Sequence, residues 1–284
     1  MFDIIVMSAA IAAAQPATCT DWQQENRLID GEAGTIAVTV DYPADAGAVP
    51  FILVNGGSSY RVREEAAFAV QLLQPACMAI VRYDRRGHGE SHGEAVIAST
   101  LNSPDIVPLL AGDGLRVVES LRADSDMPVS SFGLLGSSFG AWLNAEMASR
   151  SDNIDYFVSI SAGAVSVGVS DHYDSLTDRG VAQHEALAQS RALASAPGYD
   201  PAAGLQNAEA TGLFIFGLND LSNPSQLEIE RLQQPDLSAG DFTVIAIEDA
   251  DHNLVRESTG AIAMEAMQDM VAWIREQDVA RRAE

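Results

Sequence analysis

The stretch Gly136-Ser137-Ser138-Phe139-Gly140 reads G-x-S-x-G and decides how the rest of the chain is interpreted. Residues 129–135 before it (VSSFGLL) are a short apolar run rich in strand formers, and residues 141–150 after it (AWLNAEMASR) favour a helix and lack proline. A strand, a sharp turn and a helix in this order let the pattern present its serine as a nucleophile. Glycine is needed where strand and helix pass closely. We therefore predict Ser138 as a nucleophile; the alternative is a glycine-rich connection without chemistry.

The composition of the 284-residue chain fits one globular domain with a sizeable core. Acidic residues number 40 against 16 basic ones, every basic residue is arginine, and the formal net charge is −24. A surface this negative repels phosphate backbones and anionic lipids, so we expect neither nucleic acid nor a membrane surface as a partner. Past the N-terminus, no apolar run is long enough to span a bilayer. The acidity fits either a saline habitat or a solvated acidic face without special purpose.

The N-terminus has features of a secretion signal. Residues 4–14 form an apolar run of signal-peptide length, and the small residues 12–14 before Gln15-Pro16 offer a cleavage site. The first three residues carry no positive side chain, which departs from that pattern. We predict a signal segment and N-terminal tail over residues 1–24 and export to the periplasm or the outside. The alternative is a buried N-terminal helix in a cytoplasmic protein.

Two cysteines, Cys19 and Cys77, lie outside these motifs. In an exported protein an even number of cysteines makes a disulfide a candidate. Two unrelated thiols are an equally good interpretation, because sequence alone does not determine which cysteines pair.

Strand-like and helix-like segments alternate along the chain, which predicts an α/β fold with a mostly parallel central sheet flanked by helices. The first two strands are expected as an antiparallel pair. The expected strands are residues 27–30, 35–42, 51–54, 79–83, 129–135, 156–161, 212–216 and 243–247. The expected helices are residues 64–73, 105–121, 141–150 and 261–277.

One segment interrupts this alternation. Residues 164–210 contain no convincing strand and are far longer than an ordinary connection in an α/β fold. Helix-forming residues dominate residues 178–196. We predict a helical lid over residues 164–210, inserted between two parts of one core, residues 25–163 and 211–284.

A serine nucleophile needs a base to take its proton and a carboxylate to orient that base. In one large fold class these groups follow in the order serine, acid, histidine at the carboxyl ends of strands. Asp220 follows the strand expected at residues 212–216, and His252 lies between the last strand and the last helix. We predict Ser138, Asp220 and His252 as a catalytic triad. The alternative for Asp220 is a turn former or a helix N-cap.

An acyl-transfer site also needs hydrogen-bond donors for the developing oxyanion. The backbone N–H of Phe139 lies at the start of a helix, whose dipole favours negative charge. The glycine-rich loop after residues 51–54 offers a second donor, for which we choose Gly57, with Ser58 next. The alternative is a flexible turn without this role. No cysteine–histidine spacing suits a metal ion, and neither a metal nor an organic cofactor is expected.

Several motifs resemble the α/β-hydrolases. Residues 84–91 (DRRGHGES) resemble the D-x-R-G-x-G-x-S loop of that family, and residues 55–57 (NGG) resemble its H-G-x oxyanion loop, with Asn55 in place of the usual histidine. Residues 159–163 and 250–252 are also similar. The likeness extends over about residues 25 to 280 and is nearest to bacterial hydrolases around the serine aminopeptidase and dienelactone-hydrolase-like branches.

The resemblance implies an α/β-hydrolase fold, with a structural role for the loop that begins at Asp84. It also implies a serine hydrolase that cleaves a carboxylic ester or a related acyl bond through an acyl-enzyme, with a small-molecule ester as substrate. A serine peptidase acting on short peptides is the first alternative, with acidic residues such as Asp171, Asp174 and Glu185 recognising a free amino terminus. The second is a hydrolase fold kept as a non-catalytic binding module, because fold alone does not prove activity.

Overall fold

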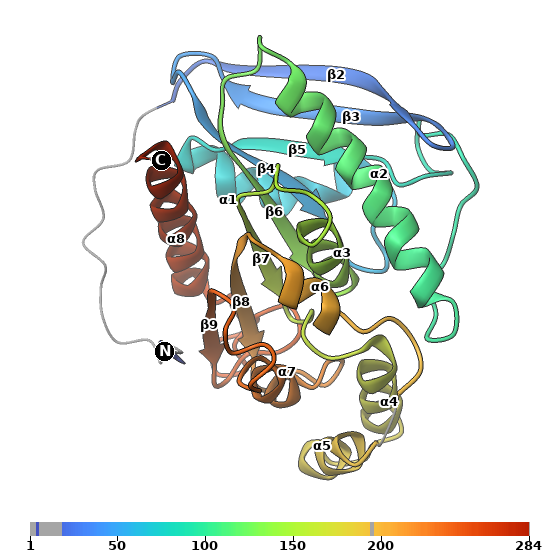
Figure 1. Ribbon diagram of the computed structural model, residues 1–284. Helices are drawn as coiled ribbons and strands as arrows, with labels where there is room; N and C mark the ends of the chain where they lie inside the picture. The colour runs from blue at the N-terminus through green and yellow to red at the C-terminus, as the bar shows by residue number, and fades with distance from the viewer. Residues whose placement is uncertain (1–3, 6–18, 194–195, 284) are drawn as a thin grey trace.

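The structure, a computed structural model, describes residues 4–5, 19–193 and 196–283. Its centre is one sheet in which the described strands follow the order β1-β9-β8-β7-β6-β4-β5-β3-β2 (Figure 1). All neighbouring strands are parallel except the pairs β2–β3 and β3–β5. The predicted mostly parallel sheet, opened by an antiparallel pair, is therefore confirmed.

The strands are β1 (Ile4–Ile5), β2 (Trp22–Gly31), β3 (Gly34–Pro43), β4 (Val49–Asn55), β5 (Ala79–Tyr83), β6 (Val129–Ser137), β7 (Tyr156–Ile160), β8 (Thr211–Gly217) and β9 (Phe242–Ile247). Two short 3₁₀ helices are η1 (Arg63–Ala66) and η2 (Gln74–Ala76). The α-helices are α1 (Ala67–Leu73), α2 (Ser103–Ala123), α3 (Phe139–Ala148), α4 (Val167–Asp178), α5 (Gln183–Arg191), α6 (Ala202–Asn207), α7 (Ser225–Leu232) and α8 (Met264–Ala283).

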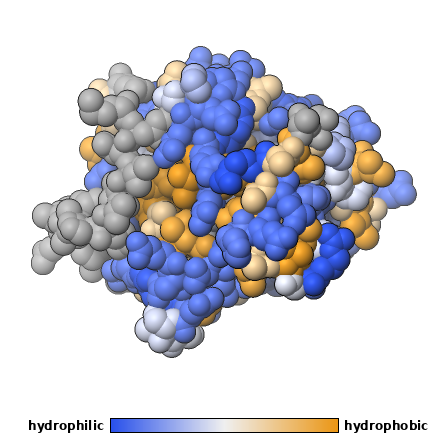
Figure 2. Space-filling model, turned by 90° about the horizontal axis from the view of Figure 1, so that it is seen from below, coloured by the Kyte–Doolittle hydropathy of each residue, from blue (hydrophilic) through white to orange (hydrophobic). Residues whose placement is uncertain are grey.

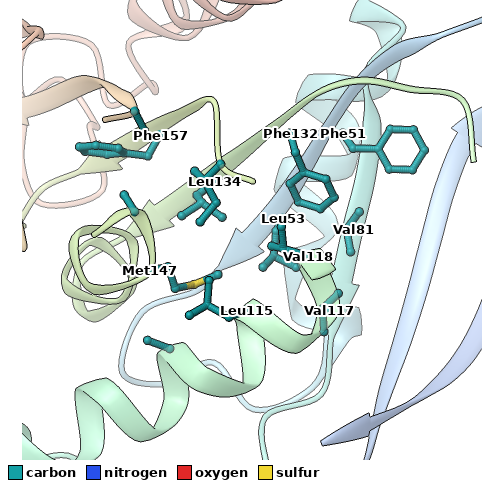
Figure 3. Packing of buried hydrophobic residues seen from close by; sticks show 14 of the residues in the cluster. Phe51, Leu53, Val81, Leu115, Val117, Val118, Phe132, Leu134, Met147 and Phe157 are labelled. Atoms are coloured by element: carbon teal, nitrogen blue, oxygen red, sulfur yellow. The ribbon is translucent and has the colours of Figure 1, made fainter. Parts of the chain in front are cut away.

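Helices cover both faces of the sheet, which explains why its parallel strands are apolar along their length. On one face, side chains of α2 and α3 pack against β4, β5 and β6; Leu115, Val118 and Met147 meet Leu53 and Phe132 there (Figure 3). On the other face, α1 and α8 bury their apolar residues against the same strands. The strands are thereby fixed between two helical layers, and their carboxyl ends form a rigid edge.

The segment between β7 and β8 forms the helices α4, α5 and α6. Figure 1 shows α4 and α5 at the lower end of the molecule, beyond the strands. Helix α4 lies within the expected helical lid but, except for Asp178, before residues 178–196, where helix-forming residues dominate, because its valine, glycine and serine residues are poor helix formers. The Ser166 hydroxyl accepts a hydrogen bond from the Val169 N–H at its N-terminus, and Tyr173 and Leu176 are buried. Capping and tertiary packing therefore outweigh local propensity here.

The N-terminal prediction lies mostly outside the described residues. Of the expected signal run, only Ile4 and Ile5 are described, and their backbone pairs in parallel with β9. Strand β2 begins at Trp22, three residues before the core boundary expected at residue 25. None of the helices in the described part of the chain is both long and apolar enough to cross a membrane.

A disulfide joins Cys19 to Cys77, with 5.7 Å between their Cα atoms. Of the two alternatives left open by the sequence, the structure therefore has the bonded pair. Cys77 follows η2 just before β5, and Cys19 lies just before β2. The bond ties the segment before β2 to the segment before β5, which is separated from β2 by one strand, across 58 positions of sequence.

A buried carboxylate joins α7 to the loop after β7. Glu228 has no exposed surface. Its Oε2 atom accepts hydrogen bonds from the N–H groups of Ala164 (2.6 Å) and Val165 (2.8 Å), and its Oε1 atom accepts one from Asn223 Nδ2 (2.9 Å). Burial raises the pKa of Glu228 to about 7, although these hydrogen bonds act in the opposite direction. The loop after β7 and the loop after β8 are thus held by one titratable group.

Replacing both cysteines with serine should lower the free energy of unfolding by about 2–4 kcal/mol, because the unfolded chain regains the entropy that a cross-link over this span removes. Urea denaturation of the wild type and the Cys19→Ser/Cys77→Ser variant measures the difference. Equal stability of the two proteins under non-reducing conditions would contradict the assigned bond. Thiol titration of the unfolded wild type, expected to find no free thiol, is the control.

Glu228 should make the protein less stable as the pH rises. Because its pKa is higher in the folded state than in the unfolded state, the folded state binds more protons between the two values, and stability falls as the pH rises from below 4.5 through 7. The uncharged variant Glu228→Gln lacks this effect. The wild type should lose about 2 kcal/mol more than the variant between pH 5 and pH 8 in urea denaturation. Parallel pH profiles of the two proteins would contradict this assignment.

Candidate active site

The predicted site residues gather at the carboxyl edge of the sheet, which is where ligands bind in open α/β sheets. Neighbouring strands end side by side there, with Asn55 of β4 paired to Gly136 of β6 and Gly217 of β8 paired to Ile247 of β9. The loops that follow these strands carry the predicted residues. Figure 2 shows the molecule from below, where β8 and β9 end in Figure 1, and hydrophilic residues surround smaller hydrophobic patches on this face.

Ser138 is at a sharp turn between β6 and α3. Its backbone has φ 50° and ψ −121°, a conformation that is uncommon for a residue with a side chain and costs about 1–3 kcal/mol. The Ser138 N–H donates to the Ile160 carbonyl (2.8 Å), and its own carbonyl accepts from the Ala141 N–H (2.9 Å). These bonds hold the strained turn, with the side chain at the start of the helix.

The two glycines of the motif allow the segments around Ser138 to touch. A Cβ atom on Gly140 would overlap the carbonyl oxygen of Asn55, and one on Gly136 would overlap the carbonyl oxygen of Gly140. Helix α3 therefore lies directly against the end of β4, which no other residue at position 140 would permit. This contact brings the loop after β4 beside the serine.

Asp220 and His252 are in direct contact, with 2.7 Å between Asp220 Oδ2 and His252 Nδ1. The Asp220 side chain is completely buried, and its other oxygen accepts hydrogen bonds from the N–H groups of Ser222 (2.7 Å) and Asn223 (2.8 Å). Because the carboxylate is an acceptor, we assign the proton on the ring to Nδ1, which leaves Nε2 with a free lone pair. The ring is therefore oriented and ready to accept a proton.

Ser138 and His252 line the same cavity, which has a volume of about 390 Å³. We call it the serine cavity; Phe139, Trp142 and Asp174 are also among its lining residues. Within the part of the chain that the structure describes, no hydrogen bond joins the Ser138 hydroxyl to the His252 ring. Such hydrogen bonds are often long without substrate and shorten in the complex. The structure thus pairs Asp220 with His252 and places Ser138 in the cavity that His252 faces.

The predicted oxyanion donors lie next to the serine. Phe139 is the first residue of α3, where the backbone N–H has no partner within the helix. A Cβ atom on Gly57 would lie 3.4 Å from the Ser138 Cβ, so this loop passes directly beside Ser138. Ser58, the second choice, lines the serine cavity itself.

Asn55 has a role that the sequence did not reveal. Its Nδ2 atom donates to Asn144 Oδ1 (2.9 Å), and its Oδ1 atom accepts from the Tyr83 hydroxyl (2.9 Å). Asn144 in turn donates to the Val158 carbonyl (2.8 Å). This buried chain of amides anchors the loop that carries Gly57 to α3 and β7. A lone asparagine after a strand carries no signal that would have predicted it.

The loop after β5 contains Asp84, which has a structural role, and Arg85, a cavity residue that the sequence did not predict. Asp84 accepts hydrogen bonds from the backbone and side chain of Arg63 and from the Glu90 N–H, in line with the structural role that the resemblance implied. The next residue, Arg85, lines the serine cavity and was not predicted. It occupies an unspecified position of the D-x-R-G motif, so the motif contained no signal for it.

Two opposing effects act on the basicity of His252. Burial lowers its pKa, but the hydrogen bond and charge of Asp220 raise it, and the charges of Asp174 and Asp251 add to that effect. The net result is a pKa above the ordinary value of 6.5. Of the other nearby carboxylates, Asp251 accepts hydrogen bonds from the Asn253 and Val255 N–H groups rather than from the ring. The imidazole is therefore a stronger base than a free histidine.

Over the described residues, no group of three or more histidine, cysteine or carboxylate side chains is arranged to hold a metal ion. The four other histidines lie elsewhere; His92, for example, is within hydrogen-bond distance of Thr35, and His172 of Ser190.

No protein-family model and no curated protein matches this chain. Many solved structures do. An esterase of Pyrococcus furiosus is 13% identical over 95% of this chain and 99% of its own, with a TM-score of 0.66. A putative dienelactone hydrolase from Klebsiella pneumoniae is 16% identical over 90% of this chain and 99% of its own, with a TM-score of 0.62.

A third similar structure is an acylaminoacyl peptidase of Pyrococcus horikoshii, which is 15% identical over 91% of this chain but only 42% of its own, with a TM-score of 0.65. At these identities the likeness is one of fold. Together with the strand order and the turn at Ser138, it shows that the chain has the α/β-hydrolase fold.

Proposed function

We propose that this protein is a serine hydrolase that transfers an acyl group to water. The Ser138 hydroxyl attacks a carbonyl carbon of the substrate while His252 Nε2 takes its proton. Asp220 holds the imidazole in the required tautomer and stabilises the imidazolium that forms. His252 then gives the proton to the leaving group, which departs and leaves the acyl-enzyme. Water attacks the acyl-enzyme while His252 takes its proton, and His252 returns that proton to Ser138 as the acid product leaves.

The negative charge that develops on the carbonyl oxygen needs preorganised donors. We assign this role to the backbone N–H groups of Phe139 and Gly57. The dipole of α3 adds to the stabilisation because its positive end faces the reacting carbonyl. The mechanism needs no metal ion or organic cofactor.

The observation that carries the proposal is the 2.7 Å contact between Asp220 and His252 at the cavity that Ser138 lines. A buried carboxylate that orients a half-buried histidine ring from a different loop is the arrangement that a catalytic triad requires. The strained backbone of Ser138 is a second support, because such strain persists mainly where function requires it.

A carboxylic ester is the substrate class that we favour, and the likeness to an esterase and a putative dienelactone hydrolase supports it. Peptide hydrolysis is the second candidate. The acidic residues Asp171 and Asp174 line the serine cavity and could bind a free amino group, and one similar structure is an acylaminoacyl peptidase. Comparing p-nitrophenyl acyl esters with aminoacyl p-nitroanilides separates the two. A non-catalytic binding module would hydrolyse neither.

We assign residues 164–210 to a lid. Helix α4 supports this, because Val167, Ser170 and Asp174 of that helix line the serine cavity. The Tyr173 hydroxyl donates to the Asp220 carbonyl (2.8 Å), so the helix is also tied to the loop of the triad acid. Movement of α4 would therefore change both the access of substrate to the serine cavity and the position of Asp220.

We also propose export of the protein to an oxidising compartment. The Cys19–Cys77 disulfide supports it, since such bonds are rare in reducing compartments. N-terminal sequencing of the protein from its host tests the proposed processing.

Ser138→Ala should lower the turnover number on a p-nitrophenyl ester by a factor on the order of 10⁶, judging from other triads. Ser137→Ala is the matched control, since Ser137 lines a different cavity, and it should keep activity near the wild-type value. Unchanged activity of the Ser138→Ala variant, with both proteins folded by circular dichroism, would contradict the mechanism.

The acidic limb of the pH profile should report His252. Only the neutral imidazole accepts the serine proton, so kcat/KM should fall at low pH with a midpoint above 6.5, in line with the raised pKa. Asp174→Asn removes a negative charge that stabilises the imidazolium, and it should move the midpoint to lower pH. Asp152→Asn, the same change on an exposed loop, is the control. A midpoint that Asp174→Asn leaves in place would contradict this account of the histidine.

A further inference from the structure

The arginines of this protein are almost all paired with carboxylates, as expected for a chain with 40 acidic residues and 16 arginines. Within the described residues, all but four of the arginines form an ion pair. Two of the exceptions line the serine cavity. The four exceptions are Arg61, Arg85, Arg179 and Arg275.

Arg85 is the more buried of the two cavity arginines, with 6% of its surface exposed. Its guanidinium lies over the rings of Tyr60 and Phe139, 5.5 and 5.3 Å from their centres. The Nη2 atom donates to the Gly56 carbonyl (2.6 Å), whereas the buried Nε atom has no hydrogen-bond partner. The Nε atom has no accessible surface, so a ligand in the serine cavity would meet the terminal nitrogen atoms of this buried cation next to Phe139.

Arg61 adds a second positive charge at the same cavity. Its Nη1 atom donates only to backbone carbonyls, those of Ser58 and Tyr60. The charge of Arg61 lowers the pKa of Arg85 in addition to the larger effect of burial, which shows that the two guanidinium groups act on one another. The nearby Glu65 carboxylate accepts hydrogen bonds from the Arg61 and Val62 N–H groups and forms no ion pair with either guanidinium in the described structure. Two guanidinium groups that line one cavity without an ion pair form a site for an anion.

We propose that Arg61 and Arg85 bind a carboxylate of the substrate, so that the serine cavity selects esters or related acyl compounds that carry a carboxylate besides the bond that is cleaved. This inference rests on the proposed function, since it assigns a substrate class to the same cavity. It requires no new chemical step. The planar guanidinium of Arg85 offers the carboxylate a donor geometry that neutral substrates cannot use.

The acidic residues of the cavity come from a different element than the arginines, which follow β4 and β5. Asp171 and Asp174 come from α4, and Asp174 acts on His252, whereas the charges that act on Arg85 include Arg61 and Glu65. The net charge of −24 repels anions at a distance. That repulsion is screened beyond about 8 Å at physiological ionic strength, so the charged groups that line the cavity, two arginines and two aspartates, decide locally where an anion binds.

The first test compares substrates that carry a free carboxylate with the methyl esters of the same compounds. One pair is monomethyl adipate and dimethyl adipate, with the carboxylate in the acyl part. The other is butyryloxyacetic acid and its methyl ester, with the carboxylate in the leaving part. The wild type should show a kcat/KM about 10-fold or more higher for the anionic member of at least one pair, because a site built to hydrogen-bond a group rejects analogues that lack it. The pair that shows it locates the carboxylate.

Variants then test whether the preference for anionic substrates depends on Arg61 and Arg85. Arg85→Met and Arg61→Gln should remove most of the preference, while Arg85→Lys should keep part of it. Arg179→Gln, which removes the same charge at an exposed position outside the cavity, should keep all of it. An equal loss of activity of Arg85→Met on charged and neutral substrates would overturn the proposal, because it would mean that Arg85 only positions the Gly56 loop. A wild-type preference for the neutral esters, or for aminoacyl substrates, would overturn it as well.

A binding measurement separates this inference from the proposed mechanism. In the Ser138→Ala background, isothermal titration calorimetry should detect monomethyl adipate, with affinity reduced about 10-fold or more by adding Arg85→Met and unchanged by adding Arg179→Gln. Fluorophosphonate labelling of the wild type independently tests Ser138. Binding without labelling would contradict the hydrolase proposal alone, and labelling without any arginine-dependent binding would contradict the carboxylate site alone.

Discussion

The close approach of α3 to the end of β4 is the constraint on which the rest of the site depends. Gly140 lies against the carbonyl oxygen of Asn55, and this contact exists only because position 140 carries no side chain. Beside this contact the turn at Ser138 has a strained conformation, and the Gly57 loop lies next to the serine. The close approach thus holds Ser138, the N-terminus of α3 and the Gly57 loop near one another.

Buried polar groups hold the other loops of the site. Asp220 and Glu228 are both without exposed surface, and each accepts backbone N–H hydrogen bonds from loops at the carboxyl edge. Asn223 connects them, because its N–H donates to Asp220 and its side chain donates to Glu228. Such a network is stable only when every member has partners, so the acid loop and the loop after β7 are held as a unit.

Much of this arrangement could be predicted from sequence, because it follows from strong local patterns. The apolar runs predicted the parallel strands, and the order of Ser138, Asp220 and His252 along the chain predicted that they would meet at one edge of the sheet. The glycines of the loop after β4 predicted a close approach, and Gly57 does lie beside Ser138. These features depend on residue type and order, which the sequence displays directly.

Other features depend on contacts between distant segments and could not be predicted. Asn55 is anchored by Tyr83 and Asn144, and Arg85 lines the serine cavity without an ion pair to any described residue. Helix α4 forms from residues of low helix propensity because its apolar side chains are buried. In each case the deciding partner lies far away in sequence, and no local pattern marks it.

The most direct test of the central claim is a crystal structure of the protein after reaction with a fluorophosphonate. We expect phosphorus bound to Ser138 Oγ, with a phosphonyl oxygen about 2.7–3.1 Å from the backbone nitrogens of Phe139 and Gly57. An adduct on another residue, or a phosphonyl oxygen that points away from both nitrogens, would contradict it.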